Sequence, residues 1–312
     1  MRLTLPTAAL LALALPAAAQ EAAEPPTPAS VVAAAPASDW KPIDPADLLV
    51  MDLAPDAAGK PRRVIIQLMP PPFSQGWVEN IRALAKAHWW DGTSVYRVVD
   101  NWVAQWGDAD ETKPLPEGLR VVPESDYVVD DFYGNDGGPG DVEAYELEAR
   151  TSRDPYADTS MMWGGFPVAG SQGAAWPIHC YGHVGVARDI ESTGTGSELY
   201  AVIGHAPRQL DRNIAVIGRV IEGIEQLSTL PRGPAGTNGV YEDAALRVPI
   251  ISVRLGNEVA EFPQPRFEYL DGDSFYRYAR VRANRQDSFY KVPAGGIDVC
   301  NIQVPIRRVP SE

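Results

Sequence analysis

The segment SVYRVVDNWVAQWGDAD, residues 94–110, holds side chains whose types and spacing could do chemistry. Apolar residues on both sides of the Asp100-Asn101 pair predict two strands joined by a turn. Arg97 lies among valines in the first strand, and Gln105 lies beside a tryptophan in the second. A guanidinium beside so much apolar surface is costly unless it is paired or used. The two side chains are therefore candidate hydrogen-bonding groups of a binding or catalytic site.

Hydrolysis and metal chemistry have less support in the sequence. The G-x-S-x-G motif of many serine hydrolases does not occur in it. Four histidines could act as bases: His88, His179, His183 and His205. The stretch HCYGH also offers Cys180, but its histidine spacing suits a helix, whereas the surrounding residues predict strand or loop. We expect neither a catalytic triad nor a metal or other cofactor.

The first residues are typical of a secretory signal peptide. Arg2 precedes an apolar run over residues 8–15, and small residues follow at Ala17 and Ala19. We predict a signal peptide over residues 1–19 and a periplasmic or otherwise exported chain. An uncleaved membrane anchor is the alternative. The formal net charge of −14 argues against nucleic acid or an anionic membrane surface as a partner.

Cys180 and Cys300 are the only cysteines in the sequence. In an oxidising compartment, an isolated pair of cysteines is a disulfide candidate. A bond that closes so long a loop stabilises a fold by about 4–5 kcal/mol in the chain-entropy model. We predict a disulfide that ties the C-terminal segment to the main domain, with two free buried thiols as the alternative.

Composition and periodicity separate a central domain from its flanks. Residues 20–45 are rich in Ala, Pro and Glu, which predicts a flexible linker. Residues 46–255 carry most of the strand-like alternation and form the predicted domain. Within this domain, Gly-rich sequence over about 108–176 predicts a long loop insertion. Residues 256–312 are rich in aromatic residues and arginine and predict a C-terminal extension packed on the domain.

Helical patterns are few in this chain. One amphipathic helix is predicted over residues 74–91, and a second over residues 220–230 with Ile224 and Leu227 on one side. The other periodic segments of the domain alternate as strands, and helices do not alternate with them. This order favours an antiparallel sheet or barrel with helices at its ends. Residues 276–282 alternate Tyr and Arg and fit either a strand or a helix.

Three stretches in register resemble the cyclophilin family of peptidyl-prolyl cis-trans isomerases. VENIRALAKAHWWDGTSVYRVVDNWVAQWGD is similar to the family's first helix, its catalytic-arginine strand and the turn that follows. GTGSELYAVIG and LDRNIAVIGRVIEGIEQL are similar to its later strands and closing helix. The similarity covers roughly residues 61–255, and RVVDNWVAQWGD is similar to an exported bacterial branch. It implies a mainly β fold, a closed antiparallel eight-stranded barrel capped by two α-helices, here with the insertion and the extension.

The resemblance also implies roles for individual residues. Arg97 takes the place of the family's catalytic arginine, and Gln105 that of the glutamine beside it. The implied substrate-binding residues form or border the pocket for the proline ring: Trp102, Val103, Asp189, Glu198, Tyr200, Leu210 and Ile214. Among them, Asp189 replaces an asparagine that contacts the substrate backbone.

Three positions depart from the family pattern. Gln209 replaces a frequent tryptophan, Ile214 replaces a pocket histidine, and Glu198 replaces a glutamine. A carboxylate at position 198 could pair with Arg97 or Arg188. We therefore expect a proline pocket with altered specificity.

Rotation about an X-Pro bond suits these residue types. Amide resonance opposes the rotation with a barrier of about 18–20 kcal/mol. As resonance is lost in the twisted state, the prolyl nitrogen gains a lone pair that a guanidinium can hydrogen-bond. Catalysis of this rotation needs neither a nucleophile nor a metal. It needs an apolar cup that holds the proline ring.

The predicted function is acceleration of X-Pro rotation in exported polypeptides by a hydrogen bond from Arg97 to the prolyl nitrogen. We expect a monomer that acts on proline-containing polypeptides, with no nucleic acid and no membrane partner beyond export. The alternative is a non-catalytic peptide- or protein-binding module of the cell envelope, which the departures from the family pattern motivate.

Overall fold

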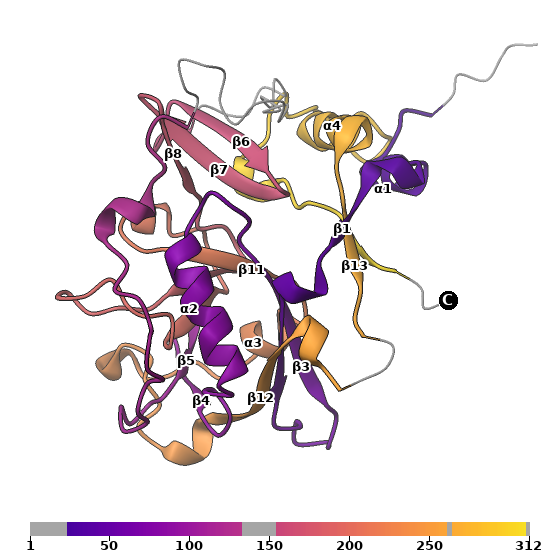
Figure 1. Cartoon of the computed structure of the whole chain (residues 1–312). Helices are drawn as coiled ribbons and strands as arrows, with labels where there is room; N and C mark the ends of the chain where they lie inside the picture. Colours follow the sequence, from indigo (N-terminus) through magenta and orange to yellow (C-terminus); the bar gives the residue numbers. More distant parts are fainter. Residues whose placement is uncertain (1–23, 133–153, 261–263, 310–312) are drawn as a thin grey trace, which may run out of the picture.

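The computed structural model describes residues 24–132, 154–260 and 264–309. The predicted signal peptide, residues 1–19, lies outside the described residues, as does the middle of the predicted insertion. Figure 1 shows a barrel below, a small sheet above it, and a third group of elements to one side that contains both described ends of the chain.

The central domain is a closed eight-stranded antiparallel barrel with the strand order β10-β5-β4-β12-β2-β3-β11-β9. This confirms the predicted fold class. The strands are β2 (Leu48–Leu53), β3 (Arg62–Leu68), β4 (Ser94–Val98), β5 (Val103–Gly107), β9 (His183–Val186), β10 (Leu199–Val202), β11 (Val216–Glu222) and β12 (Val248–Leu255).

Two helices cover the barrel. Helix α2 (Gln75–Lys86) packs against β11 and β12, and it buries Trp77, Ile81 and Leu84 at helical spacing. The second predicted helix is wrong over its first half. The residues up to Glu222 continue strand β11, and only the single turn α3 (Glu225–Ser228) is helical.

Gly223 explains why the second helix is so short. It separates β11 from α3 with a φ of 85°, a conformation that suits glycine. A Cβ atom at this position would lie 2.0 Å from the carbonyl oxygen of Arg63. The apolar spacing that suggested a helix is therefore shared between a strand and the turn that follows it.

The predicted loop insertion contains a sheet of its own. Strands β6 (Thr159–Trp163), β7 (Phe166–Ser171) and β8 (Ala174–Pro177) form an antiparallel three-stranded sheet. Here the prediction of a loop was wrong, because two-residue turns at Gly164-Gly165 and Gln172-Gly173 make hairpins out of Gly-rich sequence.

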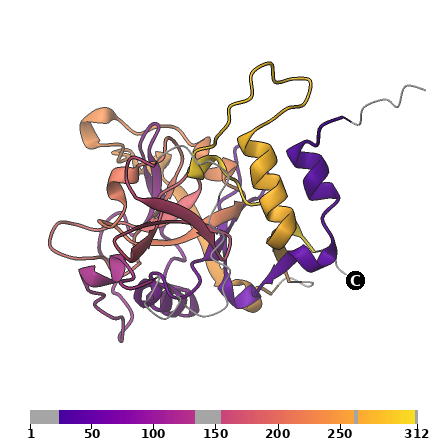
Figure 2. The ribbon, with the colours of Figure 1, turned by 90° about the horizontal axis from the view of Figure 1, so that it is seen from above.

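The prediction of a flexible linker over residues 20–45 is wrong from residue 28 onward. Residues Pro28–Ala33 form helix α1, and β1 (Trp40–Ile43) pairs with β13 (Phe267–Leu270). Helix α1 lies beside α4 (Gly272–Ala283), as Figure 2 shows from above. The Ala- and Pro-rich composition concealed this structure, because its partners lie at the other end of the sequence.

The C-terminal extension is joined to the rest of the chain by three groups of packed side chains. Strand β14 (Ile306–Arg308) completes the third sheet, in the order β1-β13-β14. One apolar cluster joins α1 and α4 to the insertion sheet, a second joins β13 to β2 and β3, and a third surrounds Cys180 and Val299. Residues 276–282, for which strand and helix were both open, are helical.

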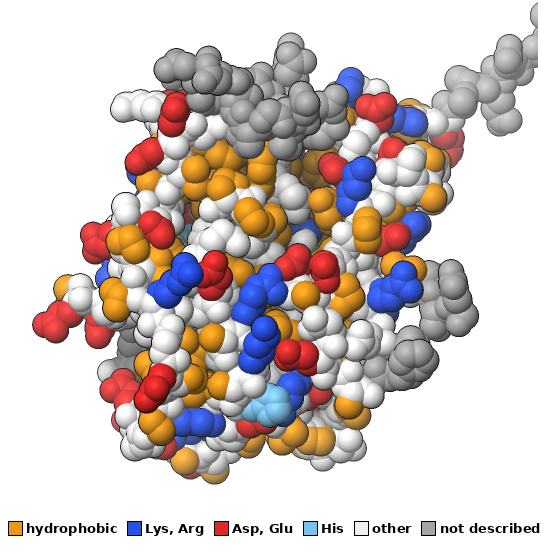
Figure 3. Space-filling model, in the orientation of Figure 1, with side chains coloured by type: hydrophobic (Ala, Val, Ile, Leu, Met, Phe, Trp, Pro, Cys, Tyr) orange, Lys and Arg blue, Asp and Glu red, His pale blue; other side chains and the backbone are white. Residues whose placement is uncertain are grey.

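Acidic and basic side chains are interspersed on the face shown in Figure 3, and hydrophobic side chains gather on it around the insertion sheet. No described helix has both the length and the apolar character needed to cross a bilayer.

Candidate active site

The β4–β5 hairpin brings the two polar side chains of the opening segment together. Arg97 and Gln105 are directly opposite each other in the register of the two strands. The Nη1 group of Arg97 donates a hydrogen bond of 2.8 Å to Oε1 of Gln105. The turn contains Asn101 at a φ of 50°, which asparagine tolerates better than most residues.

A β-bulge adds Tyr96 to the same wall. The register of β4 shifts between Val95 and Arg97, so that the usual alternation of side chains across the sheet is interrupted there. Tyr96 and Arg97 both line one cavity although they are adjacent in the sequence. The sequence prediction missed Tyr96, because a regular strand would place it on the opposite face from Arg97.

A chain of hydrogen bonds then runs from Arg97 to a carboxylate. Nε2 of Gln105 donates to the Tyr96 hydroxyl at 2.5 Å, and that hydroxyl donates to Oε2 of Glu198 at 2.8 Å. Oε1 of Glu198 accepts from the backbone N–H of Asp108 at 2.7 Å. We call this set Arg97, Gln105, Tyr96 and Glu198 the arginine chain. Every donor in it points toward Glu198.

Glu198 does not form either of the two ion pairs that the sequence left open. It accepts from Tyr96 and from the Asp108 backbone, rather than pairing with Arg97 or Arg188. The Arg188 guanidinium instead donates to the backbone carbonyls of Asn213 and Asp189. Burial raises the pKa of Glu198 above its ordinary value, and burial likewise raises the pKa of Tyr96, which keeps its hydroxyl a donor at neutral pH.

The arginine chain uses only part of the hydrogen-bonding capacity of Arg97. Its Nε donates to the carbonyl of Asn238 at 2.8 Å, and Cζ lies 5.4 Å from the ring centroid of Trp102. Of the roughly five N–H groups of a guanidinium, those at Nε and one at Nη1 have acceptors among the described residues. Burial lowers the pKa of Arg97, yet an arginine remains cationic at neutral pH. The remaining N–H groups can bind a ligand.

All of the predicted site residues line one cavity of about 760 Å³. They are Arg97, Gln105, Trp102, Val103, Asp189, Glu198, Tyr200, Leu210 and Ile214. The apolar members form a separate cluster outside the barrel core, made of Val103, Tyr200 and Val202 with Val99, Trp102, Ala187, Leu210 and Ile214 packed against them. The cavity therefore has an apolar cup beside a polar wall.

Asp189 has a local structural task on the cavity wall. Its Oδ1 accepts from the backbone N–H groups of Glu191 and Ser192, which holds the loop after β9. These hydrogen bonds from Ser192 lower the pKa of Asp189. Gln209, the first departure from the family pattern, is exposed and does not line the cavity.

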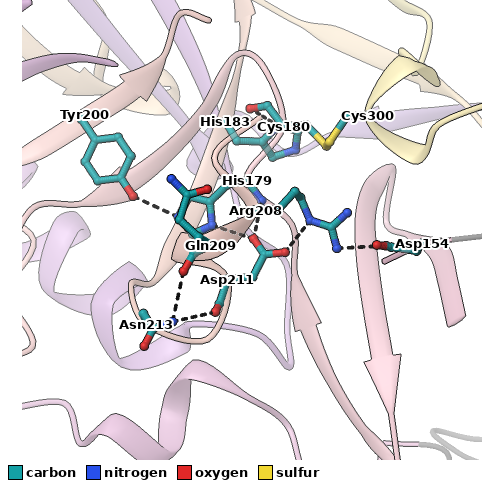
Figure 4. A network of polar contacts seen from close by, with 10 residues as sticks. All are labelled: Asp154, His179, Cys180, His183, Tyr200, Arg208, Gln209, Asp211, Asn213 and Cys300. Carbon is teal, nitrogen blue, oxygen red and sulfur yellow. Dashed lines mark hydrogen bonds and ion pairs between the residues drawn. A yellow bond between two sulfur atoms is a disulfide. The ribbon is translucent and has the colours of Figure 1, made fainter. Parts of the chain in front are cut away.

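A second polar network begins at Tyr200 of the cup (Figure 4). The Tyr200 hydroxyl lies 2.9 Å from Nε2 of His179, and Nδ1 of His179 lies 2.9 Å from Oδ1 of Asp211. Oδ2 of Asp211 accepts from Nε of Arg208 at 2.6 Å, and Nη2 of Arg208 donates to Asp154 at 2.9 Å. We call this set Tyr200, His179, Asp211, Arg208 and Asp154 the tyrosine chain.

The tyrosine chain is closed and almost fully buried. The side chains of His179 and Asp211 are 1% and 4% exposed. Because Asp211 accepts from Arg208 and from the backbone N–H of His179, Nδ1 of His179 acts as the donor to it, and Nε2 accepts from Tyr200. The close approach also requires Gly185, where a Cβ atom would lie 2.4 Å from the Tyr200 hydroxyl. Sequence reasoning identified only Tyr200 of this chain as a site residue.

The cysteine and histidine side chains of the stretch HCYGH have other partners. Cys180 forms a disulfide with Cys300, with an S–S distance of 2.04 Å, so the predicted bond is present and its sulfur is not a thiolate. His179 belongs to the tyrosine chain, and Nδ1 of His183 lies 3.1 Å from the Cys180 carbonyl. No group of three or more metal-binding side chains occurs among the described residues.

Comparison with protein families matches residues 65–255 to the family described as cyclophilin type peptidyl-prolyl cis-trans isomerase/CLD. This chain belongs to the cyclophilin family. The family acts on proline-containing peptides, and the matched residues include both walls of the cavity. A search of curated proteins found no match for this cyclophilin.

One solved structure shows the same fold over nearly the whole chain. Cyclophilin AquaCyp293 from Hirschia baltica is 21% identical, with a TM-score of 0.64, and the alignment covers 92% of this chain and 99% of that one. A cyclophilin-type isomerase from Cryptosporidium parvum is 14% identical, with a TM-score of 0.37, over 67% of this chain and 96% of that one. Because the first match spans nearly both chains, its fold resembles that of this cyclophilin beyond the barrel.

Proposed function

We propose that this cyclophilin accelerates rotation about X-Pro bonds in exported polypeptides, and that Arg97 donates a hydrogen bond to the prolyl nitrogen in the transition state. One observation carries the proposal. Arg97 is fixed by two acceptors beside an apolar cup and keeps N–H groups for a ligand. A cation held in this way suits a group that becomes an acceptor only as the peptide bond twists.

The magnitude of the Arg97 effect can be bounded. The uncatalysed barrier is about 18–20 kcal/mol, and a hydrogen bond to a charged donor contributes about 1.5–3 kcal/mol. This corresponds to a rate increase of roughly ten- to a hundredfold from Arg97. The cup must supply the remaining acceleration by holding the proline ring out of water and in position.

The apolar cup supplies a site for the proline ring. Val103, Tyr200 and Val202 form its buried base, and Leu210 and Ile214 pack against them. The tyrosine chain limits movement of the Tyr200 ring, because the Tyr200 hydroxyl is hydrogen-bonded to the buried His179. Replacement of the family's histidine by Ile214 makes the cup more apolar, which favours X-Pro segments without polar neighbours.

The proposal is tested with an isomerisation assay on an X-Pro tetrapeptide. NMR exchange spectroscopy measures the rate at which its cis and trans forms interconvert. We expect acceleration by the wild type, and a kcat/KM roughly ten- to a hundredfold lower for Arg97→Ala. Arg254→Ala is the matched control, because Arg254 lies on a barrel strand, pairs with Asp91 and does not line the cavity. Full activity of Arg97→Ala would contradict the assignment of Arg97.

The departures at Glu198 and Ile214 favour one alternative, a non-catalytic module that binds peptides in the same cup. The isomerisation rate with wild-type protein distinguishes the enzyme from the binding module. A wild-type protein that binds the tetrapeptide, but leaves its isomerisation at the uncatalysed rate, would support the binding module and exclude the enzyme.

We also propose that the protein is exported and acts in the periplasm. The signal-peptide pattern of residues 1–19 supports this location, and so does the Cys180–Cys300 disulfide, because such bonds persist in oxidising compartments. Fractionation of producing cells should place a chain that begins at Gln20 in the periplasmic fraction. A full-length chain with free thiols in the cytoplasm would contradict export.

A further inference from the structure

A second cavity lies where the barrel, the insertion sheet and the C-terminal extension meet. It has a volume of about 310 Å³ and shares no lining residue with the proline cavity. Its walls come from β11, from the segment before β9, from the start of β7 and from residues 299–306. We call it the junction cavity. Its size is at the lower end of the range for small-molecule sites.

Arg219 is the first unusual feature of the junction cavity. It lines the cavity and is only 7% exposed. Its Nε and Nη2 donate to Oε1 of Gln67, at 3.0 and 2.8 Å, and its Nη1 donates to the carbonyl of Gly165. Cζ lies 4.7 Å from the ring centroid of Phe166. These partners are all uncharged, and no carboxylate pairs with Arg219 among the described residues.

A buried cation without a counter-ion is costly. Burial lowers the pKa of Arg219 to about 10, so the guanidinium is still charged at neutral pH. Three of its roughly five N–H groups are used by Gln67 and Gly165, and the others have no acceptor among the described residues. The side chain therefore has both charge and hydrogen-bonding capacity for an anionic group.

His183 adds an acceptor to the same wall. It is the register partner of Arg219 across β9 and β11, and it is 7% exposed. Its Nδ1 lies 3.1 Å from the Cys180 carbonyl and must carry the proton, since a carbonyl can only accept. Nε2 is then an acceptor, and it is buried without a partner among the described residues.

Much of the remaining lining of the junction cavity is apolar, and Tyr181, Gln303 and the Cys180–Cys300 disulfide complete it. Val220, Ile221 and Ile224 come from the barrel side, and Ile302, Val304 and Ile306 from the extension. We propose that the junction cavity binds a small carboxylic acid that has an apolar side chain and an adjacent N–H or O–H donor. The carboxylate would accept from Arg219, the adjacent donor would reach His183, and the side chain would fill the apolar part.

Occupancy of the cavity would also tie the three parts of the molecule together. A ligand held there contacts β11 of the barrel, the insertion sheet at Gly165 and the extension at residues 302–306. Binding to the folded state alone raises the temperature of unfolding as ligand concentration increases. The site is independent of the proline cup, so its failure would not affect the proposed isomerase.

The test compares three probes that share an isobutyl group, titrated into the disulfide-bonded protein by calorimetry. N-acetyl-leucine has the carboxylate and the N–H, N-acetyl-leucine amide lacks the charge, and 4-methylpentanoate lacks the donor. We expect N-acetyl-leucine to bind most tightly and to raise the unfolding temperature. The amide should bind at least about tenfold more weakly, because it loses a charged hydrogen bond, and 4-methylpentanoate should be intermediate.

Variants of the protein test whether N-acetyl-leucine binds in the junction cavity. Arg219→Met keeps most of the hydrocarbon stem and should weaken N-acetyl-leucine binding at least about tenfold. Arg97→Ala, which removes a guanidinium from the other cavity, should leave this affinity unchanged. Amide NMR signals of Gly165, Gly182 and Ile302 should shift on binding. If Arg219→Met does not fold, the three probes and the NMR shifts of the wild type still show whether the ligand binds in the junction cavity.

Three results would overturn the proposal. One is no detectable binding of N-acetyl-leucine to the wild type. Another is equal binding of the acid and its amide, which would remove the role of Arg219. The third is an NMR shift confined to residues of the proline cup, which would place the ligand in the isomerase site.

Discussion

Two polar chains border the same apolar cup, and they differ in how completely their hydrogen bonds are satisfied. The arginine chain begins at a partly exposed guanidinium with N–H groups to spare and ends at Glu198. The tyrosine chain runs from Tyr200 to Asp154 through buried groups that all have partners. The difference suggests a division of labour, in which the open chain acts on the substrate and the closed chain fixes the shape of the cup.

The largest expected effect on stability comes from removing Asp211, the central residue of the tyrosine chain. Asp211→Ala leaves Arg208 with only Asp154 and removes the acceptor of His179. We expect a loss of about 3–5 kcal/mol in the free energy of unfolding, measured in urea, because the buried Arg208 loses one of its two carboxylates and the buried His179 loses its acceptor. Asp100→Ala is the matched control. Its carboxylate pairs with Arg232 but is 81% exposed, so the loss should be below about 1 kcal/mol.

A smaller loss of stability should follow removal of the Tyr200 hydroxyl. Tyr200→Phe keeps the ring in the cup but leaves Nε2 of His179 buried without a donor. The free energy of unfolding should fall by about 1–3 kcal/mol, while kcat/KM should change less than about threefold. A large loss of activity with unchanged stability would show that the two chains are not divided as described.

Removal of Gln105 from the arginine chain should have the opposite effect, a loss of activity with little loss of stability. Gln105→Leu removes one of the two acceptors of Arg97 and the donor to Tyr96. We expect kcat/KM to fall about tenfold because Arg97 is less well positioned, and stability to fall by about 1 kcal/mol or less. Gln226→Leu serves as the control, because Gln226 is a half-buried glutamine outside the cavity. Unchanged activity of Gln105→Leu would mean that Arg97 is positioned without the chain.

The smallest effect concerns the pH dependence contributed by Glu198. Burial raises its pKa in the folded state above the unfolded value, so the folded state binds the proton more tightly. The corresponding stability is present below the unfolded pKa and is lost as the pH rises through the folded pKa. Compared with Glu198→Gln, the wild type should therefore lose stability over this acidic window and then remain level. A difference that grows in the other direction would mean that hydrogen bonds to the carboxylate outweigh its burial.

The Arg97–Gln105 part of the arginine chain was predictable from the sequence because it is local. Arg97 and Gln105 lie on two strands joined by a short turn, and the turn fixes their register. Tyr96 was not predictable, because the bulge that turns it toward the cup leaves no clear signal in the residues. The family resemblance identified Glu198 as part of the site, but its partner could not be assigned without the structure.

The tyrosine chain and the flanking elements could not be predicted from the sequence for a different reason. His179, Arg208 and Asp154 come from separate segments, and their approach depends on how the insertion folds against the barrel. In the same way, β1 was read as part of a linker because its partner, β13, lies in the C-terminal extension. Pairing between such distant segments has no local pattern for sequence reasoning to detect.

The most direct test of the division of labour compares Arg97→Ala with Asp211→Asn in parallel. For each variant, kcat/KM on an X-Pro tetrapeptide and the free energy of unfolding are measured under the same conditions. We predict that Arg97→Ala loses roughly ten- to a hundredfold in kcat/KM with little loss of stability. Asp211→Asn should lose stability, while its folded fraction keeps most of the activity. Retention of wild-type activity by Arg97→Ala would contradict the central claim that the open chain carries the chemistry.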